Sequence, residues 1–331
     1  MAWAVHAEWR DWTGVVKDEL SAVIRTIAQY EPICLLAPRE ELADAGARFS
    51  GGNVEIVEAP VDDIWMRDIA PTFAWQGEEI VAIDWNFNGW GNTANRSARP
   101  GDRLAQLAES IFGAPRISVP FVAEGGAFIT DGEGTLITTR SCLLNPNRNA
   151  VRSGENRERL IESELAELGI RRVVWLEGNP CESVTSGHID GYGMFTAPGA
   201  VLVEVVDDEQ AEPPLRREHD IATLEAAMDA AGRTLLVERV RAPRKRYWKF
   251  RSKYWAPCYL NAYVANNAVI VARFGDAERN EAAKNTFASE FPGRDIVMLD
   301  INHIADGGGG IRCLTQPMPQ ANRTDINQKG R

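Results

Sequence analysis

Short runs of apolar and β-branched residues recur along the whole chain and set its main pattern. Runs of about four to eight such residues, bounded by turn-forming residues, are typical of strands that lie in a buried sheet. The pattern predicts strands over residues 32–38, 54–60, 79–85, 134–139, 171–176, 200–206, 234–240, 267–274 and 295–301.

Longer segments with apolar residues at helical spacing lie between these runs. Apolar residues three and four positions apart form one face of a helix, and most of the segments end at glycine, which favours helix termination. The predicted helices cover residues 18–30, 103–113, 155–169, 220–232 and 276–293. They recur at intervals of roughly 60 residues, so the order of elements indicates an internally repeated α/β architecture.

Composition argues against several classes of function. The 331 residues are 44% hydrophobic and 25% charged, which is typical of a globular enzyme with one large core or two domains. A net charge of -11 argues against a general affinity for nucleic acid or an anionic membrane and leaves room for a small cationic substrate. The N-terminal residues MAWAVHAEWRDW lack the basic start and apolar core of a signal peptide, and no apolar run approaches the ~18 residues of a membrane span. We therefore expect a cytoplasmic protein.

The cysteines give the first hint of chemistry. The chain contains Cys34, Cys142, Cys181, Cys258 and Cys313. Their odd number, and the lack of any C-x-x-C pair, favour neither a disulfide framework nor a zinc site. We expect four of them to be buried structural thiols. Cys313 differs because four glycines precede it, which is compatible with a phosphate loop, a flexible turn, or a tightly folded backbone that presents a thiolate.

Residues 241–255, RAPRKRYWKFRSKYW, break the α/β pattern. This segment is basic and aromatic, which is the composition of a nucleic-acid-binding patch. On an acidic chain, the favoured interpretation is a solvated loop or an active-site flap whose aromatic residues pack locally.

Three groups of polar residues lie where predicted strands end. They are Asp62, Asp63, Arg67 and Asp68 around Trp65, then Glu124 before two glycines, and then His188 with Asp190 in SGHIDGYG. Each group alone is compatible with a structural role: a turn with a salt bridge, a tight turn, or a histidine whose hydrogen bonds are satisfied in the core. His188 and Asp190 are predicted to face one side of an extended segment, since alternate residues of a strand point the same way.

Together these groups contain the parts of a hydrolase with a cysteine nucleophile. Such an enzyme needs a histidine for proton transfer, a carboxylate that orients the histidine, and groups that hold the substrate. Two further carboxylates, Asp68 and Asp190, suit a planar guanidinium, which donates bidentate hydrogen bonds to carboxylates.

Four sequence blocks resemble the agmatine deiminase family, which is related to bacterial peptidylarginine deiminase and hydrolyses a guanidine to a urea. The blocks are DDIWMRDIAPTF, EGGAFITDGEGTLITTRSCLLNPNRN, GHIDGYGMFTAPG and GGGGIRCLTQ, in the family's order and spacing. The resemblance extends from AWAVHAEW to the final cysteine. It implies the pentein fold, an α/β propeller of five ββαβ-type units around a pseudo-fivefold axis, as a single catalytic domain over residues 1–331.

The resemblance also implies a role for each matched residue. Cys313 matches the nucleophile, His188 the general acid and base, and Glu124 the carboxylate that orients His188. Asp68 and Asp190 match the carboxylates that hold the guanidinium. Trp65 and Arg312 are further candidate substrate-binding residues. No metal and no cofactor are implied.

Two departures from the family pattern concern the far end of the substrate. Val184 stands where agmatine deiminases carry an acid near the second amine of agmatine, and Arg312 replaces a histidine before the nucleophile. The expected substrate is therefore agmatine, which yields N-carbamoylputrescine, or a guanidino compound with a neutral or carboxylate tail. An amidinotransferase on the same fold and a non-catalytic guanidino-binding protein are the alternatives, while homo-oligomerisation and the pathway stay open.

Overall fold

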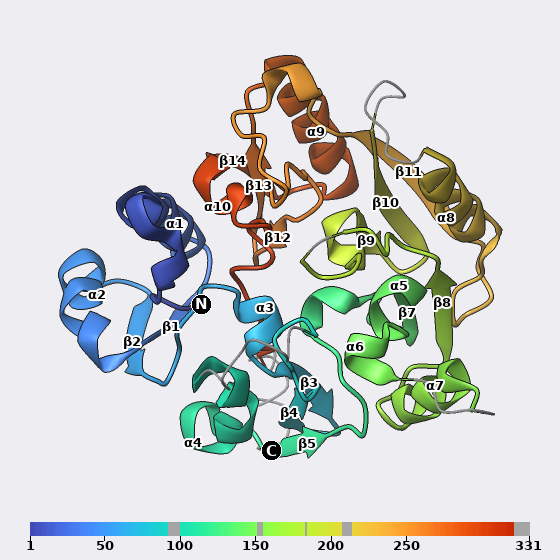
Figure 1. The fold of residues 1–331 in the computed structure, drawn as a ribbon, viewed down its shortest axis with the longest axis horizontal. Helices are drawn as coiled ribbons and strands as arrows, with labels where there is room; N and C mark the ends of the chain where they lie inside the picture. The colour runs from blue at the N-terminus through green and yellow to red at the C-terminus, as the bar shows by residue number, and fades with distance from the viewer. Residues whose placement is uncertain (92–99, 151–154, 183, 207–213, 321–331) are drawn as a thin grey trace, which may run out of the picture.

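The strands form five separate small sheets in the computed structural model, which describes residues 1–91, 100–150, 155–182, 184–206 and 214–320. One sheet has two strands and the other four have three. The sheets and their helices are arranged in a ring about a common centre (Figure 1). The predicted fold class, a pentein built from five α/β units, is confirmed.

The strands are β1 Ile33–Ala37, β2 Val54–Glu58, β3 Thr72–Gln76, β4 Glu79–Asp84, β5 Arg116–Ser118, β6 Ile129–Thr130, β7 Thr135–Thr139, β8 Arg172–Leu176, β9 Gly193–Ala197, β10 Ala200–Val205, β11 Leu236–Arg241, β12 Tyr263–Val264, β13 Ala268–Arg273 and β14 Asp295–Asp300. The α-helices are α1 Thr13–Ile27, α2 Leu42–Phe49, α3 Met66–Ile69, α4 Ala108–Phe112, α5 Arg140–Leu143, α6 Pro146–Asn149, α7 Arg157–Glu167, α8 Pro214–Ala226, α9 Ala277–Glu290 and α10 Asn302–Asp306. Short 3₁₀ helices, among them Gly125–Ala127 and Ile189–Gly191, lie between them.

Each three-stranded sheet follows one connection rule. A short antiparallel pair comes first, as β3 with β4, and a crossover through a helix then adds a parallel strand, as β5 beside β4. Helices α4, α7, α8 and α9 make these crossovers. The first sheet has only the parallel pair β1 and β2, joined through α2. We call the five sheets with their helices units one to five, in chain order.

Helices form where the apolar spacing gives them one face to bury. In α1 the side chains of Val16, Leu20, Ile24 and Ile27 are buried, and these residues lie three and four positions apart. Asp276 caps the start of the crossover helix α9, and its carboxylate accepts a hydrogen bond from the backbone N–H of Arg279 at 3.3 Å. That contact satisfies one of the unpaired donors at a helix N-terminus.

Every predicted strand overlaps an observed one, but the five-residue strands β3 and β9 and the shorter strands β5, β6 and β12 were not predicted. The helix predicted over 220–232 was wrong at both ends, because α8 begins at Pro214 and ends at Ala226. Its expected continuation is a turn instead. The carboxylate of Asp229 accepts the backbone N–H of Ala231 at 2.9 Å and of Arg233 at 2.8 Å, so this aspartate stabilises a turn.

Candidate active site

The candidate residues lie in the segments that follow the last strand of each unit. Asp68 follows β2, Glu124 follows β5, His188 and Asp190 follow β8, and Cys313 follows β14. These segments meet at the centre of the ring: α3 packs on Gly125–Ala127, which packs on Ile189–Gly191. The backbone N–H of Arg67 donates to the carbonyl of Cys313 at 3.0 Å, which ties the last segment to the first.

The glycine run before Cys313 makes room for neighbouring side chains. A Cβ at Gly307 would lie 2.1 Å from the ring of Trp9, and one at Gly309 would lie 2.5 Å from the ring of Trp65. Gly308 has φ +101°, a conformation that residues with a Cβ rarely adopt. The run is therefore a tightly folded backbone that brings Cys313 to the centre, as one of the three sequence interpretations predicted.

The thiol of Cys313 is buried and lies close to Asp190. Its Sγ is 3.7 Å from Asp190 Oδ2, and Asp190 Oδ1 is 3.8 Å from Nδ1 of His188. Asp190 thus stands between the thiol and the imidazole. Burial, together with the negative charges of Asp190 and Asp68, raises the pKa of the Cys313 thiol well above its ordinary value.

His188 forms a hydrogen bond with Glu124, with 2.8 Å between Nε2 and Oε1. Burial lowers the pKa of His188, but the negative charge of Asp68 and hydrogen bonds with Cys142 and Glu124 outweigh it. The pKa therefore lies well above its ordinary value. Burial likewise raises the pKa of Glu124, but His188 and the cation of Arg148 outweigh it and hold that pKa below its ordinary range. The pair is thus a carboxylate beside an imidazolium.

Arg148 completes this pair and was missed in the sequence. Its Nε and Nη2 lie 2.8 Å and 2.5 Å from Oε1 of Glu124, and both side chains have an exposed fraction of 0%. Nη2 also donates to the carbonyl of Thr185 at 2.9 Å, three residues before His188. Arg148 therefore positions both Glu124 and the His188 turn. Its place in the family-like block LNPNRN was the one signal that pointed to it.

Asp68 is held by two donors from other segments. Its Oδ1 accepts the backbone N–H of Gly126 at 2.8 Å, and its Oδ2 accepts Nε1 of Trp90 at 2.9 Å. A Cβ at Gly126 would lie 2.9 Å from Asp68 Oδ1 and 2.4 Å from His188 Nδ1, so this glycine lets the two side chains approach. Burial raises the pKa of Asp68 to about 6. The positive charge of His188 opposes this rise, and the negative charges of Asp190 and Glu124 add to it.

Two expectations about this region were wrong. His188 and Asp190 do not lie on an extended segment, because a 3₁₀ turn over Ile189–Gly191 follows His188. The turn still brings the two side chains together through its tight curvature. The four other cysteines are not all buried structural thiols: Cys181 is exposed, Cys34 is half-buried, and Cys142 Sγ lies 4.0 Å from Glu124 Oε1, the atom that also contacts His188.

The two remaining candidates flank the glycine run. The ring of Trp65 lies against Gly309 and also near Trp9, with 6.2 Å between the centroids of the two tryptophan rings. Arg312 Nε lies 4.0 Å from Asp190 Oδ2, and it is buried with no hydrogen-bond partner in the described part of the chain. Both residues therefore border the segment that carries Cys313.

A further group of potential metal ligands lies within the site. One ligand atom each from Glu124, Cys142 and His188 lie within 4.8 Å of one another. However, the cation of Arg148 already occupies Oε1 of Glu124 and would repel a metal ion there. The absence of a metal requirement stays a prediction.

The basic segment shows local packing of its aromatic residues. The ammonium of Lys249 lies 5.5 Å from the ring centroid of Phe250, and the guanidinium carbon of Arg251 lies 5.5 Å from that of Trp248. Trp255 is buried. This geometry agrees with the solvated loop or flap that the sequence favoured, and the carbonyl of Tyr254 lies 3.7 Å from a Cβ placed at Gly308.

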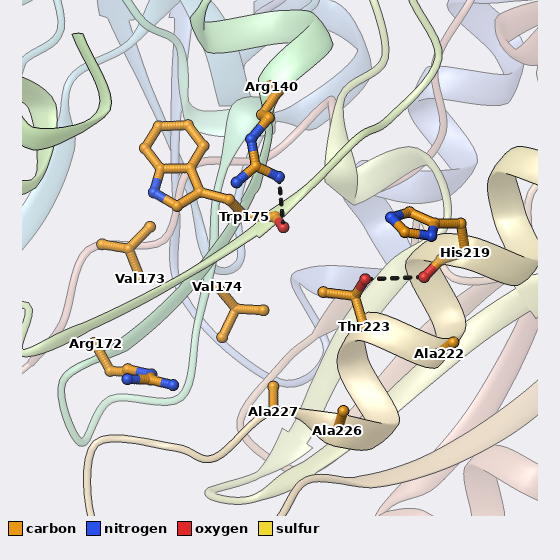
Figure 2. Close-up of a pocket in the computed structure, with 10 residues that line it drawn as sticks. All are labelled: Arg140, Arg172, Val173, Val174, Trp175, His219, Ala222, Thr223, Ala226 and Ala227. Carbon is orange, nitrogen blue, oxygen red and sulfur yellow. Dashed lines mark hydrogen bonds between the residues drawn. The ribbon is translucent and has the colours of Figure 1, made fainter. Parts of the chain in front are cut away.

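A groove of about 540 Å³ lies elsewhere, between β8 and α8 (Figure 2). Its lining includes Arg140, Trp175, His219 and Thr223, and Arg140 there is already paired with Glu158. None of the candidate site residues lines this groove, so it is not where the predicted chemistry would occur. Among the described residues, no helix has the length and apolar character that crossing a membrane requires.

Comparison with known proteins gives the family of the chain. The sequence model of the Porphyromonas-type peptidyl-arginine deiminase family matches residues 1–319. The chain is 33% identical to an agmatine deiminase of Pseudomonas aeruginosa, covering 96% of this chain and 92% of the relative. It is 35% identical to a putative agmatine deiminase of Streptomyces coelicolor, covering 96% and 97%. A solved agmatine deiminase of Enterococcus faecalis superposes with a TM-score of 0.86 at 28% identity, covering 97% and 92%. The chain therefore belongs to the Porphyromonas-type peptidyl-arginine deiminase family.

Proposed function

We propose that this protein is a guanidine deiminase of the agmatine deiminase type, a hydrolase that converts a guanidino group to a ureido group and releases ammonia. The observation that carries the proposal is the buried arrangement around Asp190, with the thiol of Cys313 at 3.7 Å and the imidazole of His188 at 3.8 Å. A guanidinium paired with Asp190 would have a nucleophile and a proton donor within reach. The single catalytic domain over residues 1–331 is part of this proposal.

Substrate binding would activate the nucleophile. The carboxylates of Asp190 and Asp68 raise the pKa of the Cys313 thiol, and a guanidinium bound between them would neutralise that charge and favour the thiolate. The Cys313 thiolate then attacks the guanidinium carbon and forms a C–S bond. Since the raised pKa of His188 favours the protonated imidazole, His188 can protonate the departing nitrogen as its C–N bond breaks.

The second half of the reaction returns the enzyme to its starting state. Loss of ammonia leaves an S-alkylthiouronium on Cys313 and a neutral imidazole on His188. The imidazole then removes one proton from water as the oxygen adds to the same carbon. The C–S bond breaks to release the thiolate, and the remaining hydroxyl proton passes to solvent, which gives the neutral ureido product. Glu124 and Arg148 hold the imidazole in place during both halves.

The tail of the substrate is proposed from the residues beside the glycine run. Val184 lies 3.5 Å from a Cβ placed at Gly308 and offers no charge to a second ammonium. The acid nearest to it in sequence, Glu182, already accepts the backbone N–H groups of Val184 and Thr185 at 2.7 Å and 2.6 Å. Arg312 adds a guanidinium whose Nε has no hydrogen-bond partner among the described residues and lies 4.0 Å from Asp190 Oδ2. Together these features support a neutral or carboxylate tail over the ammonium tail of agmatine.

An assay of guanidino compounds tests the proposed function. The protein is incubated with agmatine, with guanidino acids of similar length and with neutral alkylguanidines, and ammonia and ureido product are both measured. We expect equal amounts of the two products without any added amine. Product formation only in the presence of an acceptor amine would favour an amidinotransferase, and binding without product would favour a non-catalytic guanidino-binding protein. Formation of N-carbamoylputrescine from agmatine would connect the protein to polyamine synthesis.

A further inference from the structure

One buried side chain next to the nucleophile has no role in the mechanism given above. Asn261 lies between β11 and β12, and its exposed fraction is 4%. Its Nδ2 lies 3.1 Å from Sγ of Cys313. The fold makes this position comparable to the other site residues, because Asn261 lies in the segment that follows the last strand of unit four. With it, all five units contribute a side chain to the centre.

The neighbours of Asn261 fix which way its amide points. The backbone N–H of Cys313 donates to Oδ1 at 3.1 Å, and Nδ2 donates to the carbonyl of Asp190 at 3.1 Å. A backbone N–H can only donate and a carbonyl can only accept, so the reversed amide would lose both bonds. The second hydrogen of Nδ2 is therefore available to Sγ, and the group that faces the sulfur is a donor.

A donor at this place matters because of the charges around the sulfur. The charged groups near Cys313 are the carboxylates of Asp68 and Asp190 and the guanidinium groups of Arg67 and Arg312. Burial and the two carboxylates disfavour the thiolate, whereas hydrogen bonds from the Gly310 backbone and from Asn261 favour it. A hydrogen bond to a charged acceptor is stronger than one to a neutral acceptor, so the amide stabilises the thiolate more than the thiol.

The glycine run also accommodates this side chain. A Cβ at Gly310 would lie 2.7 Å from Oδ1 and 2.8 Å from Cβ of Asn261. Only a glycine there lets the backbone of the nucleophile segment approach the amide this closely.

We propose that Asn261 is a further catalytic residue, whose side-chain N–H donates to Sγ of Cys313 and stabilises the attacking thiolate. The same bond stabilises the thiolate when the C–S bond breaks at the end of the reaction. The inference rests on the proposed function only in taking Cys313 as the nucleophile.

Alkylation of Cys313 in the substrate-free protein tests this role. Iodoacetamide reacts with the thiolate, and mass spectrometry of the Cys313 peptide separates its rate from that of the other cysteines. The rate is measured between pH 7 and pH 11 for the parent and for Asn261→Ala. The alkylation midpoint is the pH at which the rate reaches half of its maximum. Loss of one hydrogen bond to a charged sulfur is expected to move this midpoint upward by about one to two pH units, which slows alkylation about 10- to 100-fold at pH values below the midpoint.

Asn280→Ala is the matched control. Asn280 is held by Tyr259 Oη at 2.8 Å and by the backbone of Phe274, so its loss perturbs the same core without touching the sulfur. Its alkylation midpoint is expected to stay at the parent value. A midpoint that shifts equally in Asn280→Ala and Asn261→Ala would overturn the proposal, because general loosening would then explain both.

A second variant keeps the test decisive if Asn261→Ala does not fold. Asn261→Asp has nearly the same shape, lacks the donor and adds a negative charge, so both changes oppose the thiolate. An alkylation midpoint equal to that of the parent, in either folded variant, would overturn the proposal. Since alkylation needs no substrate, this result is independent of whether the guanidino assay finds turnover.

Discussion

Replacing Arg148 by methionine tests whether the buried ion pair supports the site. Both charged groups of the Arg148–Glu124 pair are fully buried, and two arginine nitrogens contact one carboxylate oxygen at 2.5 Å and 2.8 Å. Arg148→Met leaves the Glu124 carboxylate buried with only His188 to compensate it. Breaking a buried pair by removing one partner typically costs about 3–5 kcal/mol, which is a large part of a typical unfolding free energy of about 5–15 kcal/mol.

The double variant separates the charge from the packing. In Arg148→Met with Glu124→Gln the uncompensated Glu124 carboxylate is gone, while the imidazole of His188 keeps Asp190 Oδ1 at 3.8 Å as a charged partner. We therefore expect the unfolding free energy to recover by at least about 2 kcal/mol relative to Arg148→Met alone. Urea unfolding at pH 7 measures each variant. The control is Arg239→Met, because Arg239 pairs with Glu225 at 2.9 Å while the two side chains are 48% and 49% exposed, and such pairs contribute about 0–1 kcal/mol.

Two results would refute this reasoning. One is a decrease of the unfolding free energy in Arg148→Met that is no larger than the decrease in Arg239→Met. The other is a double variant that is less stable than Arg148→Met, since the cost would then arise from lost packing and from the unpaired carbonyl of Thr185 instead of from the charge. Turnover should fall in Arg148→Met as well, because Arg148 no longer positions Glu124 and the turn that carries His188.

Three further predictions concern turnover. The pKa of Asp68 is about 6, and we propose that its charged form binds the guanidinium, so kcat/KM should fall about tenfold per pH unit below pH 6. A profile that stays flat to pH 4.5 would contradict this role. His188→Ala should lose both proton transfers and slow kcat by about 100- to 10,000-fold, whereas near-parent turnover in the folded variant would return His188 to a structural role. The parent should prefer a guanidino acid of similar length over agmatine, and Val184→Glu should raise relative kcat/KM for agmatine about 10- to 100-fold. A parent that prefers agmatine by ~100-fold, with no gain from Val184→Glu, would show that the account of the tail is wrong.

The sequence predicted the long buried strands because they carry a strong local pattern. In β13 five consecutive residues from Ala268 to Ala272 are buried, so the apolar run is continuous. Strands β6 and β12 have two residues each, and β5 has three, which is too short for any periodicity. They pair because the longer strands beside them offer free backbone groups, and that information does not lie in their own residues.

The site divides in a similar way. Cys313, His188 and Glu124 stand in distinctive motifs, so the sequence and the family resemblance identified them together. Arg148 looks like a surface arginine in sequence, because only the fold shows that its side chain is fully buried against Glu124. Asn261 is a single polar residue before a two-residue strand, and its contact with Cys313 Sγ joins residues 52 positions apart. Such roles depend on how the five units pack, which local patterns do not encode.

The most direct test of the central claim is to capture the covalent intermediate on Cys313. The parent protein is mixed with its best guanidino substrate, quenched with acid within the first turnovers, and digested for mass spectrometry. We predict that the Cys313 peptide gains the mass of the substrate minus ammonia, that the Cys181 peptide is unmodified, and that Cys313→Ala forms neither adduct nor ureido product while Cys181→Ala keeps parent turnover. Sustained ureido formation by Cys313→Ala, without any adduct in the parent, would contradict the account.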